Sequence, residues 1–183
     1  TSTVMISYDG RLQATMSITV QASATPSQLT GVTLPTVFQK NAYANITLDS
    51  FTLFDQYGAP ISLTAGYTIT VASSAGLNIS PNTVLSITSA TTTITAPNTT
   101  GNYDLVFTLK DPSNNTLSSQ SMTVQVVDTT GISSYQFDVI GTMYSKAPDN
   151  PSYQKLINIT GRTATGVSVQ LVYNPATGLP EGV

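Results

Sequence analysis

Residues 103–127 read YDLVFTLKDPSNNTLSSQSMTVQVV, and this stretch decides the fold class. Apolar and polar residues alternate from Tyr103 to Lys110 and again from Leu117 to Val127, with the run Asp111-Pro112-Ser113-Asn114-Asn115 between them. Alternation with a period of two predicts a strand with one buried face, and a short turn between two such runs predicts a β-hairpin. The sequence therefore predicts antiparallel β structure here.

The same period of two continues through most of the chain, and no helical period is found. A first hairpin is predicted from Val4 to Gln21, because Asp9-Gly10 suits a two-residue type I′ turn in which both residues need positive φ. Shorter alternating runs separated by turn residues cover Val32–Phe38, Ala44–Phe54, Ile61–Val71, Val84–Ile87 and Thr91–Ile94. Many short strands at this spacing indicate a β-sandwich or barrel.

Composition narrows the functional classes. Only 8% of the residues are charged, the net charge is −3 and the six basic residues are scattered, so we expect no nucleic-acid partner. No apolar stretch approaches the ~20 residues that span a bilayer. The absence of Cys excludes disulfides and thiolate metal sites. The start at Thr1 has no signal-sequence character, which predicts either its removal or an internal fragment of an exported protein.

Internal repetition is the most informative feature of the chain. Ser17–Gln21 (SITVQ) matches Ser121–Gln125 (SMTVQ), and both close a predicted hairpin. Two further matches pair Leu34–Lys40 with Ile140–Lys146 and Asn45–Thr47 with Asn158–Thr160. The first two offsets are about 105 residues, which is the size of one immunoglobulin-like sandwich, so we expect tandem domains.

This repeat length predicts three segments. Residues 1–24 form the final hairpin of a preceding immunoglobulin-like domain, residues 25–128 a complete domain, and residues 129–183 the start of a following, truncated domain. An alternative division gives two complete but irregular domains that meet near Asp128. Tyr103, at the start of a late strand, fits either a tyrosine corner, whose hydroxyl bonds to nearby backbone, or ordinary packing.

Several short motifs resemble one family. Phe54-Asp55-Gln56-Tyr57-Gly58-Ala59-Pro60-Ile61 resembles the DQYG-x-P turn of bacterial immunoglobulin-like repeats in surface-layer (S-layer) proteins. Thr100–Tyr103 resembles the Gly-x-Tyr strand start of the same repeats, and Val126–Asp128 with Ile132–Tyr135 is similar to their domain joints. The repeats of adhesins are nearly as similar.

The resemblance implies a secreted structural protein at the cell surface. Its partners would be other copies of itself in a two-dimensional lattice, and a cell-wall polymer bound through modules outside this chain. It also implies that calcium supports folding or assembly. The alternatives are the stalk or binding module of an adhesin or phage tail, and a spacer in an exported enzyme.

No enzymatic activity is expected. The chain has no His or Cys, so its acids and bases are eight Asp, Glu181 and a few Lys. Paired carboxylates could still hydrolyse glycosides. However, Asp9, Asp55, Asp111 and Asp149 all neighbour Gly, Pro or Asn, where aspartate caps the amides of turns.

One metal site and one binding surface remain as candidates. Asp104 and Asp128 should lie near the same pole of the sandwich, and Asp138 of the following segment could join them to bind calcium through oxygen ligands. The alternative is solvated turn carboxylates. Tyr43, Tyr57 and Tyr67 are candidates for an exposed glycan-binding platform, with core or turn packing as the alternative.

Overall fold

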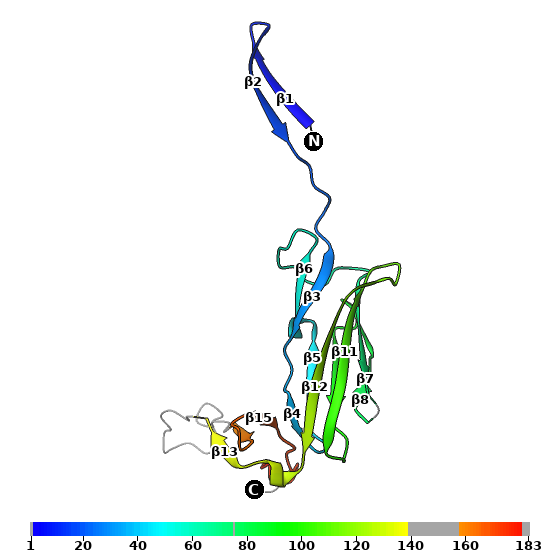
Figure 1. Cartoon of the computed structure of the whole chain (residues 1–183), viewed down its shortest axis with the longest axis vertical. Coiled ribbons are helices and arrows are strands. Elements are labelled where there is room, and N and C mark those ends of the chain that lie inside the picture. Colours follow the sequence, from blue (N-terminus) through cyan, green and yellow to red (C-terminus); the bar gives the residue numbers. More distant parts are fainter. Residues whose placement is uncertain (1, 75, 139–157, 181–183) are drawn as a thin grey trace, which may run out of the picture.

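The computed structural model describes residues 2–74, 76–138 and 158–180 of the chain. The described residues are almost all β, which confirms the predicted fold class. Three parts follow one another along the long axis in Figure 1: an N-terminal hairpin, a central sandwich and the C-terminal strands. None of these residues belongs to a helix with the length and apolar character needed to cross a bilayer.

The N-terminal hairpin consists of β1 (Ser2–Tyr8) and β2 (Arg11–Ile18), paired antiparallel. Asp9 and Gly10 have φ of 51° and 69°, so the predicted turn with two positive φ values is confirmed. The hairpin stands away from the sandwich in Figure 1, and Val4, Met5, Met16 and Ile18 are exposed on it. An isolated two-stranded hairpin is only marginally stable in water.

The central sandwich contains ten strands: β3 (Pro26–Val32), β4 (Val37–Gln39), β5 (Tyr43–Thr47), β6 (Phe51–Asp55), β7 (Thr68–Ser73), β8 (Asn78–Ser80), β9 (Val84–Leu85), β10 (Thr91–Thr95), β11 (Gly101–Lys110) and β12 (Thr116–Val127). The β11–β12 hairpin predicted from residues 103–127 is confirmed, with register running from Gly101↔Val126 to Lys110↔Thr116. These two strands form the centre of one sheet, while β5-β10-β8 and β3-β6 form the others.

The main core lies between these sheets. Its fully buried side chains alternate along the strands, as Leu105, Phe107 and Leu109 do on β11. Phe107 meets Phe51 edge to face, with ring centroids 5.6 Å apart. This packing, in which each strand contributes every second side chain, gives the sandwich most of its stability.

Three expected strands are interrupted. The run 44–54 is divided by the 3₁₀ helix η1 (Leu48–Ser50), across which the buried positions change from Ala44 and Ile46 to Phe51 and Leu53. The run 32–38 breaks around Pro35, which has no N–H to donate to a ladder. In the run 61–71 the strand starts only at Thr68, after a turn at Gly66 with φ of 84°.

Tyr103 forms the predicted tyrosine corner. Its hydroxyl donates to the carbonyl of Thr99 at 3.1 Å, which confirms the first of the two interpretations. The ring also lies directly against Gly76, where an added Cβ would approach Cε1 of Tyr103 to 2.8 Å. The tyrosine therefore joins the loop before β11 to the loop after β7.

The C-terminal strands are β13 (Ser134–Phe137), β14 (Ile159–Arg162) and β15 (Ser168–Gln170), which follow the 3₁₀ helix η2 (Thr129–Gly131). They surround a second, small core of buried residues: Val37, Ile132, Ile159, Val169 and Leu171. The division of the chain into three domain segments stays a prediction, and the repeat Ile140–Lys146 lies outside the described residues.

Candidate functional site

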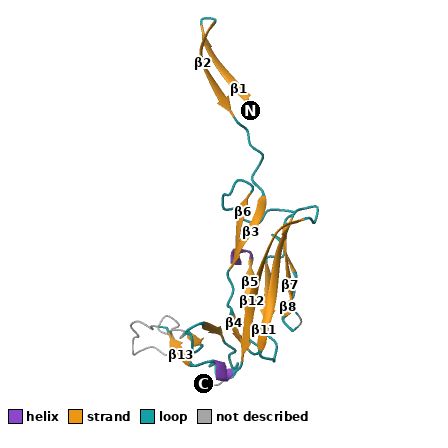
Figure 2. Ribbon diagram, in the orientation of Figure 1, coloured by secondary structure: helices purple, strands orange, loops and turns teal. Residues whose placement is uncertain are grey.

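Strand β4 connects the sandwich to the C-terminal strands. It pairs in parallel with β12 on one edge, through Val37↔Gln125 and Phe38↔Val126, and in parallel with β15 on the other, through Val37↔Val169. A single eight-stranded sheet, in the order β13-β14-β15-β4-β12-β11-β7-β9, therefore continues from one part into the other. We call β4, its two neighbours and residues 128–132 the C-terminal junction (Figure 2).

The two faces of β4 are buried in different cores. Phe38 is fully buried in the main core, whereas Val37 is 5% exposed and belongs to the second core. Successive side chains of a strand point to opposite faces, so a strand of three residues can serve both cores. Because Val37 completes a core of only five buried residues, the C-terminal strands depend on the sandwich for their packing.

Gln39 is the polar component of this junction. It is 3% exposed, and its side-chain Oε1 accepts a hydrogen bond of 3.0 Å from the backbone N–H of Val172. Two backbone bonds of 2.8 Å hold β4 to β12, from Gln125 N–H to the Thr36 carbonyl and from Lys40 N–H to the Val127 carbonyl. Losing this hydrogen-bond partner in the protein interior would cost about 1–3 kcal/mol of folding free energy, so the position of the Gln39 side chain is strongly specified.

Asp128 begins the short helix η2 that leads out of β12. Its Oδ1 accepts from the hydroxyl and the N–H of Thr130, at 2.6 and 3.1 Å. The Thr130 hydroxyl lowers the pKa of this carboxyl, opposed in part by desolvation and supported by backbone N–H groups and the charge of Lys40. Gly131 follows where an added Cβ would lie 2.7 Å from Cβ of Val127, so the chain turns tightly here.

The DQYG motif forms a turn at the opposite end of the sandwich. Asp55 is buried, and its Oδ1 accepts from the N–H groups of Tyr57 and Ala59, each at 2.8 Å. Gly58 has φ of 80°, a conformation that favours glycine. The motif residues Asp55 and Gly58 therefore shape the turn itself.

The other two motif residues hold the linker that arrives from β2. Gln56 Oε1 accepts from the N–H of Thr25 at 2.8 Å, and Gln56 Nε2 donates to the carbonyl of Ser23 at 2.8 Å. The hydroxyl of Tyr57 donates to the carbonyl of Ala22 at 2.9 Å. We call this turn with linker residues 22–25 the N-terminal junction. Each of its bonds contributes about 0.5–1.5 kcal/mol to holding the linker.

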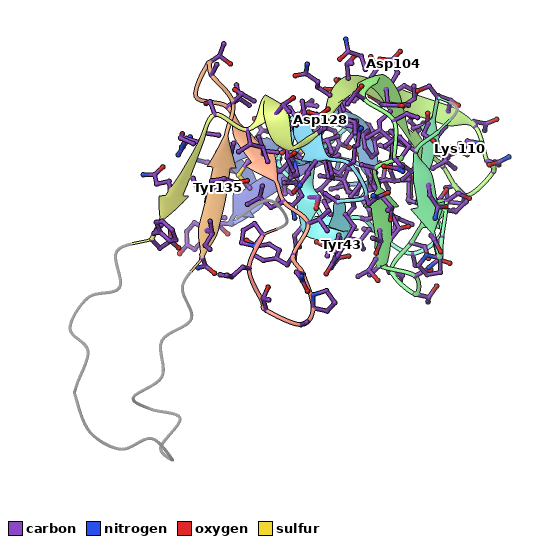
Figure 3. All side chains as sticks on the ribbon, turned by 90° about the horizontal axis from the view of Figure 1, so that it is seen from below. Tyr43, Asp104, Lys110, Asp128 and Tyr135 are labelled. Atoms are coloured by element: carbon purple, nitrogen blue, oxygen red, sulfur yellow. The ribbon has the colours of Figure 1, made fainter. Side chains whose placement is uncertain are left out.

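The three aspartates proposed for calcium are not brought together. Asp104 Oδ1 accepts from the Thr123 hydroxyl at 2.7 Å, and Thr123 precedes Asp128 by five residues on β12, which is about 17 Å in a strand. Asp138 Oδ2 accepts from Asn158 at 2.9 Å, beyond β13, which lies four strands from β12. Figure 3 places Asp104 and Asp128 on separate elements. No group of three acidic, His or Cys residues suited to a metal occurs among the described residues.

Two of the four turn aspartates, Asp55 and Asp111, have the capping role expected of them. Asp111 Oδ1 accepts from the N–H groups of Ser113 and Asn115 at 2.9 and 2.8 Å, as Asp55 does in its own turn. Asp9 lies in the hairpin turn, and Asp149 lies outside the described residues. These carboxylates organise backbone and are not arranged in a pair.

The three candidate tyrosines lie in different environments. Tyr43 is exposed on β5, Tyr57 binds the linker, and Tyr67 is partly buried against the main core. They therefore do not form one platform for a ligand.

Sequence reasoning missed the residues that make both junctions. Gln39 occurs in a chain rich in polar residues, and nothing in its immediate sequence marks it as the partner of a distant backbone group. The only available signal was the DQYG motif, which the resemblance had singled out as a turn.

Comparison with known proteins identifies the fold. No protein-family model matches the chain, and no curated protein sequence matches it. A crystal structure of the S-layer protein rSbsC(31-844) matches over 92% of the chain with 17% identity and a TM-score of 0.52. Domains 4–9 of surface layer protein SbsC match over 91% with 18% identity and a TM-score of 0.51. The chain spans 20% and 24% of these two structures. It therefore has the fold of S-layer protein domains.

Proposed function

We propose that this chain is a structural segment of a self-assembling cell-surface layer, and that it acts through end-to-end stacking of its domains and lateral contacts between copies. The observation that carries the proposal is the continuous sheet at the C-terminal junction, in which β4 is bonded to β12 and β15 at once. A shared sheet resists bending between two parts far better than a flexible linker does. The S-layer fold supports the same reading.

The surface of the chain suits a mechanical role in an assembly. Charged residues are only 8% of the sequence, so few ions need to be desolvated when copies meet. Asp55, Asp111 and Asp128 accept hydrogen bonds from backbone N–H groups of their turns, which is a structural role, and we propose no enzymatic activity. The proposed location is extracellular, at the cell surface, with other copies as the principal partner.

Assembly is tested by electron microscopy and small-angle scattering of the purified protein, with calcium chloride and separately with EDTA. We expect a rigid elongated particle and ordered arrays. Loss of the arrays in EDTA would support the calcium hypothesis, and their persistence would reject it. A monodisperse monomer under every ionic condition would reject assembly.

The alternative is the stalk or binding module of an adhesin or phage tail, because the same sandwich serves such proteins. Tyr43 and the exposed apolar residues of the hairpin are the surface features that favour it. Saturable binding on a glycan array, abolished by Tyr43→Ala, would support this function in place of the lattice.

A further inference from the structure

A turn in the C-terminal strands repeats the geometry of the DQYG turn. In the turn of residues 55–59, Asp55 N–H donates to the Ala59 carbonyl at 2.9 Å, and Gly58 has φ of 80°. In residues 163–167, Thr163 N–H donates to the Val167 carbonyl at 2.9 Å, and Gly166 has φ of 82°. The two turns are offset by 108 residues, although their sequences share only the glycine.

The strands on either side of the two turns also correspond. On the sandwich, Phe54 pairs with Pro60, and on the C-terminal strands Arg162 pairs with Ser168, which is again an offset of 108 residues. The partner strands agree as well, because β6 pairs antiparallel with β3 and β14 pairs antiparallel with β13. By this correspondence, β15 is the counterpart of residues 60–62 in the sandwich.

The two counterparts differ at their outer edges. The outer edge of β15 is covered by β4. Among the described residues, the segment 60–62 is paired only with β6, through Phe54↔Pro60 and the bond of 3.1 Å from Ile61 N–H to the Leu53 carbonyl. Alternate N–H groups of an extended segment point to opposite edges, so the N–H of Ser62 points to the outer edge.

Two grooves are lined jointly by β6 and the segment that carries this edge. One of about 310 Å³ is lined by residues that include Leu53, Ile61 and Ser62, and a second of about 320 Å³ shares these three and adds Leu48 and Leu63. Both grooves combine polar groups with the apolar side chains of Phe51, Leu53 and Ile61. A strand with alternating apolar residues would fill them.

The linker of the N-terminal junction leads back to a strand that repeats part of the β12 sequence. The linker held by Gln56 and Tyr57 comes from β2, and Ser17–Gln21 at its end repeats Ser121–Gln125 of β12. In the C-terminal junction β12 is the strand that carries β4 to β15. By these repeats β2 corresponds to β12 and residues 60–62 correspond to β15, so a strand equivalent to β4 would lie between them.

We propose that residues 60–63 receive, in parallel pairing, a β4-type strand from the repeat unit that ends in the β1–β2 hairpin. The strand would place an apolar residue in each groove and a glutamine like Gln39 beside the backbone N–H of Thr64, the counterpart of Val172. A second copy of this chain is not the source, because its own β4 is bonded on both edges. The inference rests on the proposed stacking of repeat units and is independent of lattice assembly.

The probe is a capped peptide with the sequence of residues 34–41, Leu-Pro-Thr-Val-Phe-Gln-Lys-Asn, titrated into the ¹⁵N-labelled chain and followed by NMR. A strand held by a neighbouring domain is present at millimolar effective concentration. We therefore expect saturable shifts of the amides around residues 61–64 with a Kd in the millimolar range or tighter. No saturable shift at these amides would overturn the proposal.

Two matched pairs of controls separate strand pairing from other effects. Ser62→Pro removes the outward N–H and should weaken binding at least about ten-fold, whereas Ser62→Ala should bind normally. Since the Thr36 carbonyl and Lys40 N–H face β12, the N–H of Val37 faces β15 and that of Phe38 faces β12. N-methylation of the peptide at the Val37 position should abolish binding, and at the Phe38 position should leave it intact.

Three outcomes would contradict the proposal even if a peptide shift is seen. These are equal binding by Ser62→Pro, equal binding by both N-methylated peptides, and shifts of the same amides on concentrating the chain without peptide. The last would assign the edge to a second copy. If the peptide binds but the protein forms no arrays, the lattice proposal is rejected and this inference stands.

Discussion

The side chain of Gln39 accepts a hydrogen bond from the backbone N–H of Val172, 133 residues further along the chain. This bond joins the strand shared by both cores to the segment after β15. It is the point at which the sandwich and the C-terminal strands are linked by a side chain as well as by a sheet.

Replacing Gln39 by Leu should loosen the C-terminal junction. The substitution leaves the N–H of the half-buried Val172 without its acceptor, at a cost of about 1 kcal/mol. Hydrogen exchange should therefore accelerate at Val172 and along β15, while β11 stays protected. Gln28→Leu, at an exposed position of β3, is the matched control and should change neither. Unchanged exchange at β15 would contradict the role assigned to Gln39.

Removing the clamp at the N-terminal junction should free the hairpin and leave the sandwich intact. In the double variant Gln56→Ala/Tyr57→Phe the linker loses its bonds to both side chains. Spin labels at Thr15→Cys and Ala90→Cys, in a chain without native cysteines, should then give a broader distance distribution. The melting temperature should stay close to that of the parent. Tyr43→Phe is the control, and an unchanged distribution in the double variant would refute the clamp.

Replacing Thr92 by Val should stabilise the sandwich. Thr92 is 1% exposed, and its hydroxyl is the buried side-chain group that finds no hydrogen-bond partner among the described residues. Valine has nearly the same shape and removes the desolvated hydroxyl, which should add about 1 kcal/mol to the free energy of unfolding in urea. A decrease in that free energy would show that the hydroxyl is satisfied in solution. Thr93→Val, at a half-buried position whose hydroxyl donates to Asn45, should not be stabilising.

Acid should weaken the turns capped by Asp111 and Asp128. The pKa of Asp111 is lowered chiefly by the side-chain amide of Asn115, and that of Asp128 chiefly by the Thr130 hydroxyl. A folded pKa below the unfolded value means that the stabilisation is complete above the ordinary aspartate pKa near 3.8 and is lost as the pH falls through the folded pKa. Urea unfolding between pH 2 and 6 should show this loss at the acid end. Asp111→Asn should reduce the slope there, and an unchanged slope would exclude Asp111 as a source.

Local sequence was sufficient for the features that depend on neighbouring residues. The Asp9-Gly10 turn and the β11–β12 hairpin follow from residue types within a few positions of one another, since turn geometry and side-chain alternation are local properties. For Tyr103 the sequence left two interpretations open, and the structure chose the tyrosine corner. Sequence was less successful at the strand boundaries. The alternating run 44–54 predicts one strand, and the fold interrupts it with η1.

The calcium site illustrates what local reasoning lacked. Asp104 lies on β11 and Asp128 directly follows β12, and the β11–β12 register sets them about 17 Å apart. Register between strands is a tertiary quantity, because it depends on which turn and which partner close the ladder. That calcium supports folding or assembly stays a prediction.

Local residue patterns were enough to predict the all-β class, the hairpins and the side chains that face inward, because the period of two and the turn residues act over a few positions. Long-range packing was needed for β4 to pair with both β12 and β15, for Gln39 to reach Val172 and for Gln56 to hold the linker. An alternating pattern states which face of a strand is buried but not which strand lies beside it. That choice is made by the packing of the whole chain, where edges far apart in sequence become neighbours.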